Sequence, residues 1–325
     1  MFALSSVFLL LGAAITAQAG VIPTASTTNN PAAPTSTSKA FVPLYKTLPA
    51  TPVLPPNARF QGTANVNNIE LWYTLYGPPP KLSKREPVVL LHGSQMSSRW
   101  LGAQIKHLIA SQKDRTIIAI DTRAHGRSTD DLSVPLTYDL FASDAAALLK
   151  QLGIKRAAVF GWSDGGNTAV ALAMGSSASL VERAYVYGAN ANPDQVNVTG
   201  IMTAPFWDEH AARMRAEYEA IAPVPAAWDT FSERIEDMQS ALPQWTGADL
   251  GKIKTRYEDP ENAPIVWFSG GDSEEVISRY VPGTLRDSVW GSSLVILPEV
   301  GHYGPVEDPA TLNAVLDRWL AKSRY

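Results

Sequence analysis

The sequence predicts an α/β fold, a mainly parallel central sheet flanked by helices, on three observations. Short apolar runs without polar alternation recur along the chain, as expected for strands that are covered on both faces. Amphipathic helical patterns separate these runs, and strands that alternate with helices form parallel sheets. The alternation is interrupted once, over residues 191–262, where helical patterns follow one another without a clear strand. The sequence therefore predicts a sheet domain with a helical cap inserted into it.

Seven apolar runs are expected to form the strands of the sheet. They are Leu71–Tyr76, Val88–Leu91, Thr116–Ile120, Ala157–Phe160, Arg183–Tyr187, Ile265–Phe268 and Leu294–Leu297. Two helices are clear from their patterns. The first places apolar side chains on one face between Phe141 and Leu152. The second begins with Asp308 as its N-cap and has Pro309 in its first turn, where proline is favoured.

The first part of the chain is expected to lie outside the folded domain. Residues 1–19 combine an apolar run too short to span a bilayer with an Ala-x-Ala site, which is typical of a cleaved signal peptide. An uncleaved anchor is the alternative. Residues 20–57 hold eight of the 24 prolines and only two charged side chains, so we interpret them as an extended linker. The α/β domain is then expected over residues 58–190 and 263–325, with the cap over 191–262.

Charge and cysteine content exclude several classes of function. The formal net charge is −4 and no basic stripe is present, so no nucleic-acid partner is expected. The chain has no cysteine, which excludes disulfides, a cysteine nucleophile and thiolate metal sites. The tripeptide Asn197-Val198-Thr199 is an N-glycosylation sequon. With the signal sequence, it indicates a secreted, extracellular glycoprotein without a stable membrane anchor, and the oligomeric state is left open.

The strongest chemical signal follows the predicted strand Ala157–Phe160. The chain reads Gly-Trp-Ser-Asp-Gly over residues 161–165, and a helical pattern begins directly afterwards. A sharp turn between strand and helix forces its central serine into strained dihedral angles and needs small neighbours. Gly161 and Gly165 provide that space. Because such a turn exposes the hydroxyl above the sheet, Ser163 is the predicted nucleophile.

A serine hydroxyl needs a base within hydrogen-bond reach before it can attack at neutral pH. The chain offers five histidines. His107 and His210 lie in helical patterns and are expected to be solvated, whereas His92 and His125 follow strands and are expected to be buried and structural. His302 follows the last predicted strand and precedes the last helix, so its loop can bring the imidazole to the nucleophile. His302 is therefore the predicted general base.

The imidazole in turn needs a carboxylate that fixes its tautomer and stabilises the imidazolium. The loop after Ile265–Phe268 carries Asp272, Glu274 and Glu275. All three lie between Ser163 and His302, which gives the order serine, acid, histidine along the chain. The residues themselves leave the three alternatives open.

The negative charge that develops during acyl transfer needs two backbone donors. One is expected to be the amide of Asp164, because the first N–H groups of a helix have no partner within the helix. The other is expected from the His-Gly loop after the second predicted strand, with Ser94 as the donor. The segment from Asp121 to Ser128 is interpreted as architecture, its charged side chains tying a loop together. A metal site built from Asp121, His92 and His125 finds no support in the ligand spacing, so no metal is expected.

Together these residues resemble the α/β-hydrolase superfamily, in its esterase and lipase-like branch with a helical cap. The similarity runs from about residue 60 to the end of the chain. It includes the segment after Asp121, which is similar to D-x-R-G-H-G-x-S with Ala124 in place of a glycine. The elbow over residues 161–166 is similar to that of valacyclovir hydrolase-type esterases. The run over residues 271–275 resembles G-D-x-D-E, which places Glu274 on the catalytic acid and leaves Asp272 as the alternative.

The resemblance implies a serine hydrolase that cleaves a small-molecule carboxylic ester through an acyl-enzyme, without a cofactor. Aromatic and methionine side chains in the predicted cap favour an apolar or aromatic ester. The same triad also serves lactonases, amidases or aminopeptidases, perhydrolases and carbon–carbon bond hydrolases, because a fold does not fix the reaction. A non-catalytic ligand-binding homologue is the alternative from another class of function.

Overall fold

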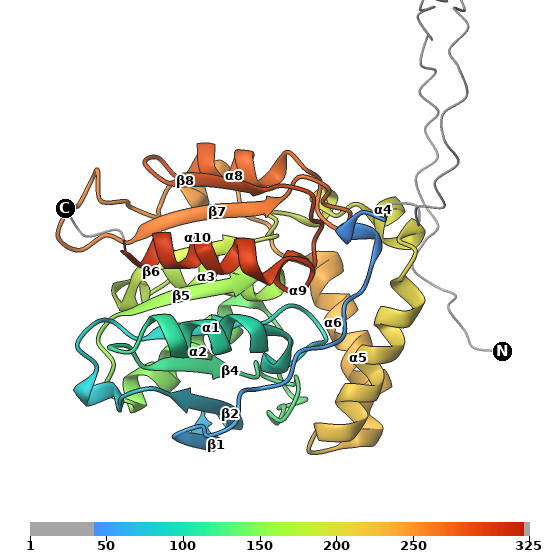
Figure 1. Cartoon of the computed structure of the whole chain (residues 1–325), viewed down its shortest axis with the longest axis horizontal. Helices are drawn as coiled ribbons and strands as arrows, with labels where there is room; N and C mark the ends of the chain where they lie inside the picture. Colours follow the sequence, from blue (N-terminus) through green and yellow to red (C-terminus); the bar gives the residue numbers. More distant parts are fainter. Residues whose placement is uncertain (1–41, 322–325) are drawn as a thin grey trace, which may run out of the picture. The chain divides into compact units, whose positions relative to one another are not determined.

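Eight strands form one sheet at the centre of the computed structural model, which describes residues 42–321 (Figure 1). Their order across the sheet is β1-β2-β4-β3-β5-β6-β7-β8. β2 runs antiparallel to both β1 and β4, and every other neighbouring pair is parallel. The strands are β1 Phe60–Val66, β2 Ile69–Tyr76, β3 Val88–Leu91, β4 Ile117–Ile120, β5 Ala157–Trp162, β6 Val181–Tyr187, β7 Ile265–Gly271 and β8 Ser293–Leu297. The predicted α/β fold class is confirmed.

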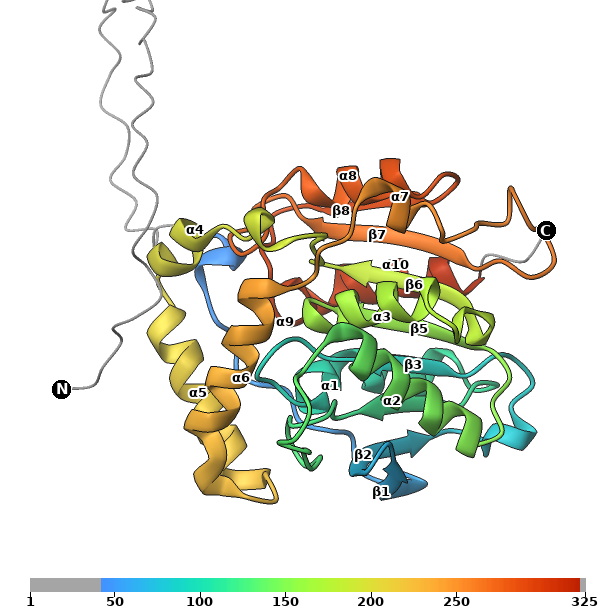
Figure 2. The same ribbon diagram turned by 180° about the vertical axis from the view of Figure 1, so that it is seen from behind.

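Two pairs of helices cover the two faces of the sheet. α1 packs against α10, and α2 packs against α3, which also contacts β3, β5 and β6. Figure 1 shows α1 and α10 in front of the sheet, and Figure 2, seen from behind, shows α2 and α3 in front. Burial on both faces explains why β3, β4 and β5 are apolar at every position. The helices are α1 Gly102–Ser111, α2 Tyr138–Gln151, α3 Asp164–Met174, α8 Val281–Ser288, α9 Gly304–Glu307 and α10 Pro309–Ala321, with short 3₁₀ turns η1 Leu44–Lys46, η2 Pro80–Leu82, η3 Ser98–Leu101 and η4 Ala178–Leu180.

The hairpin that joins β1 to β2 was not predicted. Val66 pairs with Ile69, and the intervening Asn67 and Asn68 have φ angles of 45° and 64°. Positive φ at both central residues defines a type I′ turn, which asparagine tolerates. β1 lies at the edge of the sheet, where only Ala64 and Val66 are buried, so its apolar pattern is weak. The two asparagines between apolar residues were the available signal.

Within residues 191–262 the structure describes helices and one isolated bridge. The helices are α4 Val198–Thr203, α5 Trp207–Ile221, α6 Trp228–Ala241 and α7 Gly247–Leu250, with η5 Pro193–Gln195 and η6 Pro225–Ala227. α5 and α6 lie beside the ends of the strands (Figures 1 and 2). Their buried face carries Met214, Tyr218, Phe231, Ile235 and Met238. α7 packs against α8 instead, so the last part of this insertion lies along the flank of the sheet.

Residues 42–57, which the sequence assigns to a linker, pack against the domain. The carbonyl of Pro49 accepts a hydrogen bond from Arg213 on α5 at 2.6 Å, and that of Pro55 accepts one from the Tyr76 hydroxyl at 2.9 Å. Proline lacks an N–H but keeps its acceptor, which explains how a proline-rich segment is held without a strand. The boundary drawn at residue 57 therefore falls inside a compact unit that begins at Val42. The predicted signal peptide and the first part of the linker lie outside the described residues.

None of the helices between residues 42 and 321 has both the length and the apolar character needed to cross a membrane.

Candidate active site

Ser163 occupies a strained turn between β5 and α3. Its backbone angles are φ 57° and ψ −121°, a conformation that non-glycine residues rarely adopt. The turn leaves no room for side chains beside it: a Cβ at Gly161 would overlap the carbonyl of Gly165, and one at Gly165 would overlap that of Leu91. The amide of Ser163 donates to the carbonyl of Tyr187 on β6 at 2.8 Å. The backbone of two strands thus holds the serine at the carboxyl edge of the sheet.

His302 and Glu274 meet at this edge. His302 Nδ1 lies 2.8 Å from Glu274 Oε1, and both side chains are buried. The same carboxylate oxygen accepts the amides of Val276 and Ile277 at 3.1 Å, so the loop after β7 fixes its orientation. The imidazole packs against Gly188, where a Cβ would lie 2.9 Å from His302 Cε1. Gly188 directly follows Tyr187, the residue that accepts the Ser163 amide, which places the histidine loop next to the elbow.

Three carboxylates surround His302. Glu275 Oε2 accepts the amide of His302 at 2.9 Å, and Glu307 Oε2 accepts the amide of Gly301 at 2.7 Å. Burial alone would lower the pKa of His302, but the charge and hydrogen bond of Glu274, with smaller contributions from Glu275 and Glu307, raise it above its usual value. Burial and the neighbouring carboxylates raise the pKa of Glu275 to about 7 and that of Glu307 to about 8.

Asp272 does not take part in this cluster. Its Oδ1 accepts the amide of Glu299 at 2.8 Å and the hydroxyl of Ser273 at 3.0 Å, and the residue is exposed. Of the three carboxylates that the sequence left open, Glu274 bonds the imidazole, Glu275 bonds the backbone of the same histidine, and Asp272 ties two loops together at the surface. The sequence offered Glu275 only as an alternative acid and did not single out Glu307, because only the fold brings their side chains to the backbone of the histidine loop.

Asp164 directly follows the proposed nucleophile, and Ser94 lies in a loop whose Gly93 packs against it. Asp164 is the first residue of α3, where N–H groups have no partner within the helix. Ser94 belongs to the loop after β3, and a Cβ at neighbouring Gly93 would lie 3.3 Å from Ser163 Cβ. Burial raises the pKa of the Asp164 carboxyl, and hydrogen bonds from Tyr138, Gln239 and Ser94 oppose that shift.

The remaining histidines divide as the sequence predicts, with one exception. His92 and His125 are buried and bonded to loop backbone, His92 Nε2 accepting the amide of Thr122 at 3.1 Å. His107 is partly exposed and lies 2.7 Å from Asp317. The expectation that His210 is solvated is wrong: it is 1% exposed, and burial lowers its pKa to about 3. Its helix, α5, turns this face toward the core, where the ring packs edge-on against Tyr303 and Trp100.

The segment that begins at Asp121 is structural. Asp121 Oδ1 accepts the amide and hydroxyl of Ser98, and its Oδ2 accepts the amide and guanidinium of Arg127. This carboxylate joins the loops after β3 and β4, as a charge-assisted bond can. Among residues 42–321, no three histidine, aspartate or glutamate side chains converge as metal ligands.

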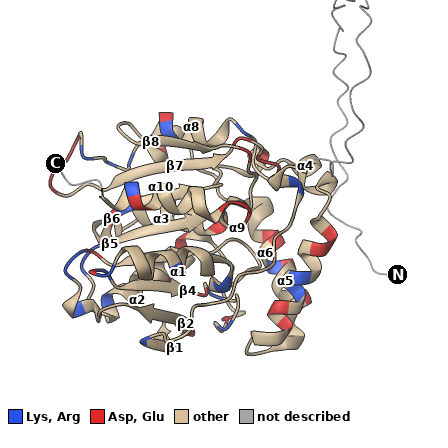
Figure 3. Cartoon of the chain, viewed as in Figure 1, with Lys and Arg blue, Asp and Glu red and all other residues tan. Residues whose placement is uncertain are grey.

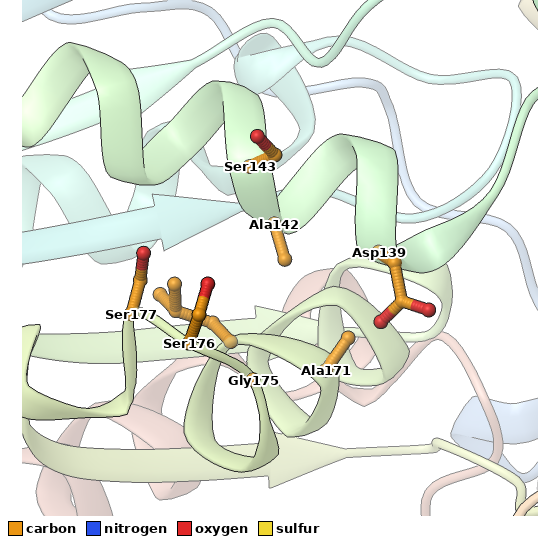
Figure 4. A pocket seen from close by; sticks show the side chains of 8 residues that line it. Asp139, Ala142, Ser143, Ala171, Gly175, Ser176 and Ser177 are labelled. Carbon is orange, nitrogen blue, oxygen red and sulfur yellow. The ribbon is translucent and has the colours of Figure 1, made fainter.

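A hollow of about 270 Å³ lies away from these residues, between α2 and the end of α3 (Figure 4). Small and polar side chains form most of its lining, which consists of Asp139, Ala142, Ser143, Ala171, Leu172, Gly175, Ser176 and Ser177. None of them belongs to the cluster around Ser163 and His302. The hollow offers no nucleophile with a neighbouring base.

The chain is similar in sequence and in fold to known proteins. Residues 88–315 match the family model described as the alpha/beta hydrolase family. The chain is 28% identical to the human serine hydrolase BPHL over 243 residues, which cover 73% of this chain and 78% of that protein. It is 33% identical to the sn-1-specific diacylglycerol lipase ABHD11 of Xenopus laevis over 247 residues, covering 66% and 72%. A meta-cleavage product hydrolase from Pseudomonas fluorescens IP01 superposes with a TM-score of 0.61 at 17% identity, covering 81% and 97%.

Proposed function

The chain belongs to the α/β hydrolase family, and from this premise we propose that it is a serine hydrolase that cleaves carboxylic esters through an acyl-enzyme. The observation that carries the proposal is the 2.8 Å contact between His302 Nδ1 and Glu274 Oε1, beside a serine held in a strained elbow. Nucleophile, base and orienting acid are the three parts that acyl transfer by serine requires.

In the proposed reaction, each residue has one task. Ser163 Oγ attacks the ester carbonyl carbon while His302 Nε2 removes the hydroxyl proton. Glu274 accepts a hydrogen bond from His302 Nδ1–H, which leaves Nε2 unprotonated as the base and stabilises the imidazolium once it forms. The amides of Ser94 and Asp164 bind the oxyanion of the tetrahedral intermediate. The intermediate collapses, the C–O bond breaks, and His302 returns its proton to the departing alcohol. In the second half of the reaction, His302 removes a proton from water, the hydroxide attacks the acyl carbonyl, and His302 returns the proton to Ser163 Oγ as the acid product leaves.

We propose an apolar or aromatic ester as the substrate class. The support is the composition of the cap face that lies beside the strand ends, where Phe206, Tyr218, Phe231 and Met238 are buried. Large apolar surfaces with few polar groups bind apolar ligands. Two relatives described above are named as a serine hydrolase and as a lipase, which is compatible with an ester substrate. A panel of p-nitrophenyl esters of increasing acyl length, with one benzoate, tests this class by kcat/KM.

Labelling with a fluorophosphonate probe tests the nucleophile. The native protein should incorporate one probe per chain, because the probe reacts with a serine that is activated by a base. Ser163→Ala should abolish both labelling and ester turnover. Ser177→Ala removes a hydroxyl far from the elbow, at the hollow between α2 and α3, and should keep both. A native protein that binds apolar esters but neither labels nor turns them over would establish the non-catalytic alternative.

We also propose that the protein is exported and glycosylated at Asn197, on the strength of residues 1–19 and the sequon. Asn197 is the N-cap of α4, and its Oδ1 accepts the amide of Gly200 at 3.0 Å. Thr199→Ala removes the sequon and leaves this cap in place. Expression in a glycosylating host should give a secreted product whose mass falls on deglycosylation in the native protein and not in Thr199→Ala. An intracellular product of unprocessed mass would contradict both parts.

A further inference from the structure

We infer that three polar side chains of the cap, Glu217, Ser232 and Gln239, are positioning residues that hold the two backbone segments of the proposed oxyanion hole. The inference rests on the proposed function, because it takes the amides of Ser94 and Asp164 as the oxyanion donors. It goes further in making the cap a part of the catalytic apparatus as well as a cover for the substrate.

The first link joins α5 to the loop after β3. The Glu217 carboxylate accepts the hydroxyl of Ser97 with one oxygen and the indole N–H of Trp100 with the other, the latter at 3.0 Å. Ser97 and Trp100 are both buried, and Ser97 is the N-cap of η3. Ser97 lies three residues after Ser94, so this link fixes the far end of the loop that carries the first donor. α5 carries acidic and basic side chains along its length (Figure 3), and Glu217 is the one that turns inward to this loop.

The second link acts on the residue that follows Ser94. Gln95 has a φ of 57°, which lies in the left-handed region that side chains other than asparagine and glycine rarely occupy. Its side-chain Nε2 donates to Ser232 Oγ on α6 at 2.7 Å. A strained residue persists only where its surroundings hold it in place. Ser94 precedes Gln95 in this loop, so the conformation of Gln95 affects the orientation of the Ser94 N–H. By holding the Gln95 side chain, Ser232 helps to keep that N–H in place.

The third link reaches the other donor. Gln239 Nε2 on α6 donates to Asp164 Oδ2 at 3.0 Å, while the Tyr138 hydroxyl donates to Oδ1 at 2.9 Å. Asp164 is 7% exposed, so its carboxylate depends on these partners for its hydrogen bonds. They orient the side chain of the residue whose amide faces the reacting carbonyl.

The two α6 residues share one face of the helix. Ser232 and Gln239 are seven residues apart, close to two helical turns, and the buried Ile235 and Met238 lie between them. One helix therefore contacts both halves of the oxyanion hole, and α5 adds the third contact. Oxyanion donors stabilise a transition state only when they are already aimed at it. Loosening these links should therefore lower kcat and leave KM nearly unchanged.

The experiment compares each link with a matched position on the same helix. Glu217→Gln is paired with Glu219→Gln, which alters an exposed ion pair with Arg215, and Ser232→Ala is paired with Ser240→Ala, which alters an exposed bond to Asp237. Gln239→Leu removes the third link at similar volume. The readouts are kcat and KM for a p-nitrophenyl ester, and the affinity for an arylboronic acid, which forms a tetrahedral adduct with the serine.

Each variant of a link should lose about 5- to 30-fold in kcat, since removing an oxyanion donor outright costs about 100- to 1,000-fold. Boronate affinity should fall in parallel, KM should change less than about twofold, and the matched controls should stay within twofold of the native protein. Final incorporation of the fluorophosphonate should remain one per chain. If Gln239→Leu does not fold, the kcat of Ser232→Ala, which is the smallest of the three changes, still tests the inference.

The two proposals fail in different ways. A native protein that neither labels nor turns over esters contradicts the proposed function. A native protein that labels at Ser163 and turns over, with link variants that keep the kcat of their controls, overturns the inference about the cap. Variants that raise KM with unchanged kcat would also overturn it, because the cap would then bind substrate without acting on the oxyanion hole.

Discussion

At the scale of single residues, the charge around His302 is the feature with the clearest consequence. The imidazole is buried, and burial alone would favour its neutral form. Glu274 opposes this by its charge and its hydrogen bond, and Glu275 and Glu307, whose carboxyl groups accept the amides of His302 and Gly301, make smaller electrostatic contributions. The sum raises the pKa of His302 above its usual value.

The pH dependence of kcat/KM should report the raised pKa of His302. The base must be neutral at Nε2, so activity falls as the pH drops through the pKa of His302. Because that pKa is raised, the acid limb should lie above the ordinary imidazole value of about 6.5. Glu275→Gln keeps an acceptor for the His302 amide. Because the pKa of Glu275 is about 7, its carboxyl carries only part of a negative charge near the limb, so the variant should move the limb slightly to lower pH. Glu274→Gln should move it further and lower the rate at all pH values.

Asp272→Asn is the matched control for these pH profiles. Asp272 is exposed and bonds Glu299 and Ser273, so the limb should stay at its native position and kcat should be nearly unchanged. A larger loss of turnover in Asp272→Asn than in Glu274→Gln would reverse the assignment of the acid.

At the scale of elements, the elbow is the part whose geometry tolerates least change. Gly161→Ala would place a methyl group inside the contact distance of the Gly165 carbonyl, and backbone cannot move aside as a flexible side chain does. We expect a loss of at least about 3 kcal/mol in the free energy of unfolding, measured by urea denaturation, or no folded protein.

Gly283→Ala is the control for the elbow substitution. Gly283 lies within α8, and a Cβ there meets no atom within 4 Å. Alanine is favoured over glycine inside a helix by about 1 kcal/mol, so this variant should be as stable as the native protein or more so. Equal stability of the two variants would mean that the elbow can relax in a way that this geometry does not allow.

The elements also differ in how far the sequence predicts them. Seven of the eight strands were predicted, because each contains a short run of mainly apolar residues between turns or helical patterns. The edge strand β1 was missed since half of its face meets solvent. Motif spacing identified Ser163 and His302 as candidates, and a family resemblance selected Glu274. The roles of Glu275 and Glu217 could not be predicted, because each depends on a contact between segments that are distant along the chain.

At the scale of the whole molecule, a cluster of arginines joins the sheet to the last helix. Arg115 and Arg183 share the carboxylate of Glu86, at 3.0 Å and 2.8 Å. The two guanidinium groups also donate to the carbonyls of Leu320 and Trp319 near the end of α10. Burial would raise the pKa of Glu86, but the two arginines lower it below its usual range. The cluster thus satisfies unpaired carbonyls at a helix C-terminus with positive charge.

Glu86→Gln should therefore destabilise the protein strongly. It leaves the fully buried Arg115 without its carboxylate, and removing one partner of a buried ion pair costs about 3–5 kcal/mol. Urea denaturation should show the loss. Asp114→Asn, which alters an exposed pair with Lys84, should change the free energy of unfolding little. Similar effects of the two changes would mean that water reaches the arginine cluster.

The proline-rich residues 42–57 have a consequence for how the protein can be prepared. The carbonyls of Pro49 and Pro55 accept hydrogen bonds from Arg213 on the cap and Tyr76 on the sheet. This segment therefore connects two parts of the fold that are separated by more than a hundred residues of sequence. A protein that begins at residue 58 would lack this segment, although its composition alone suggests that it is not part of the folded domain. It would also remove the hydrogen bond between Pro49 and Arg213 on α5.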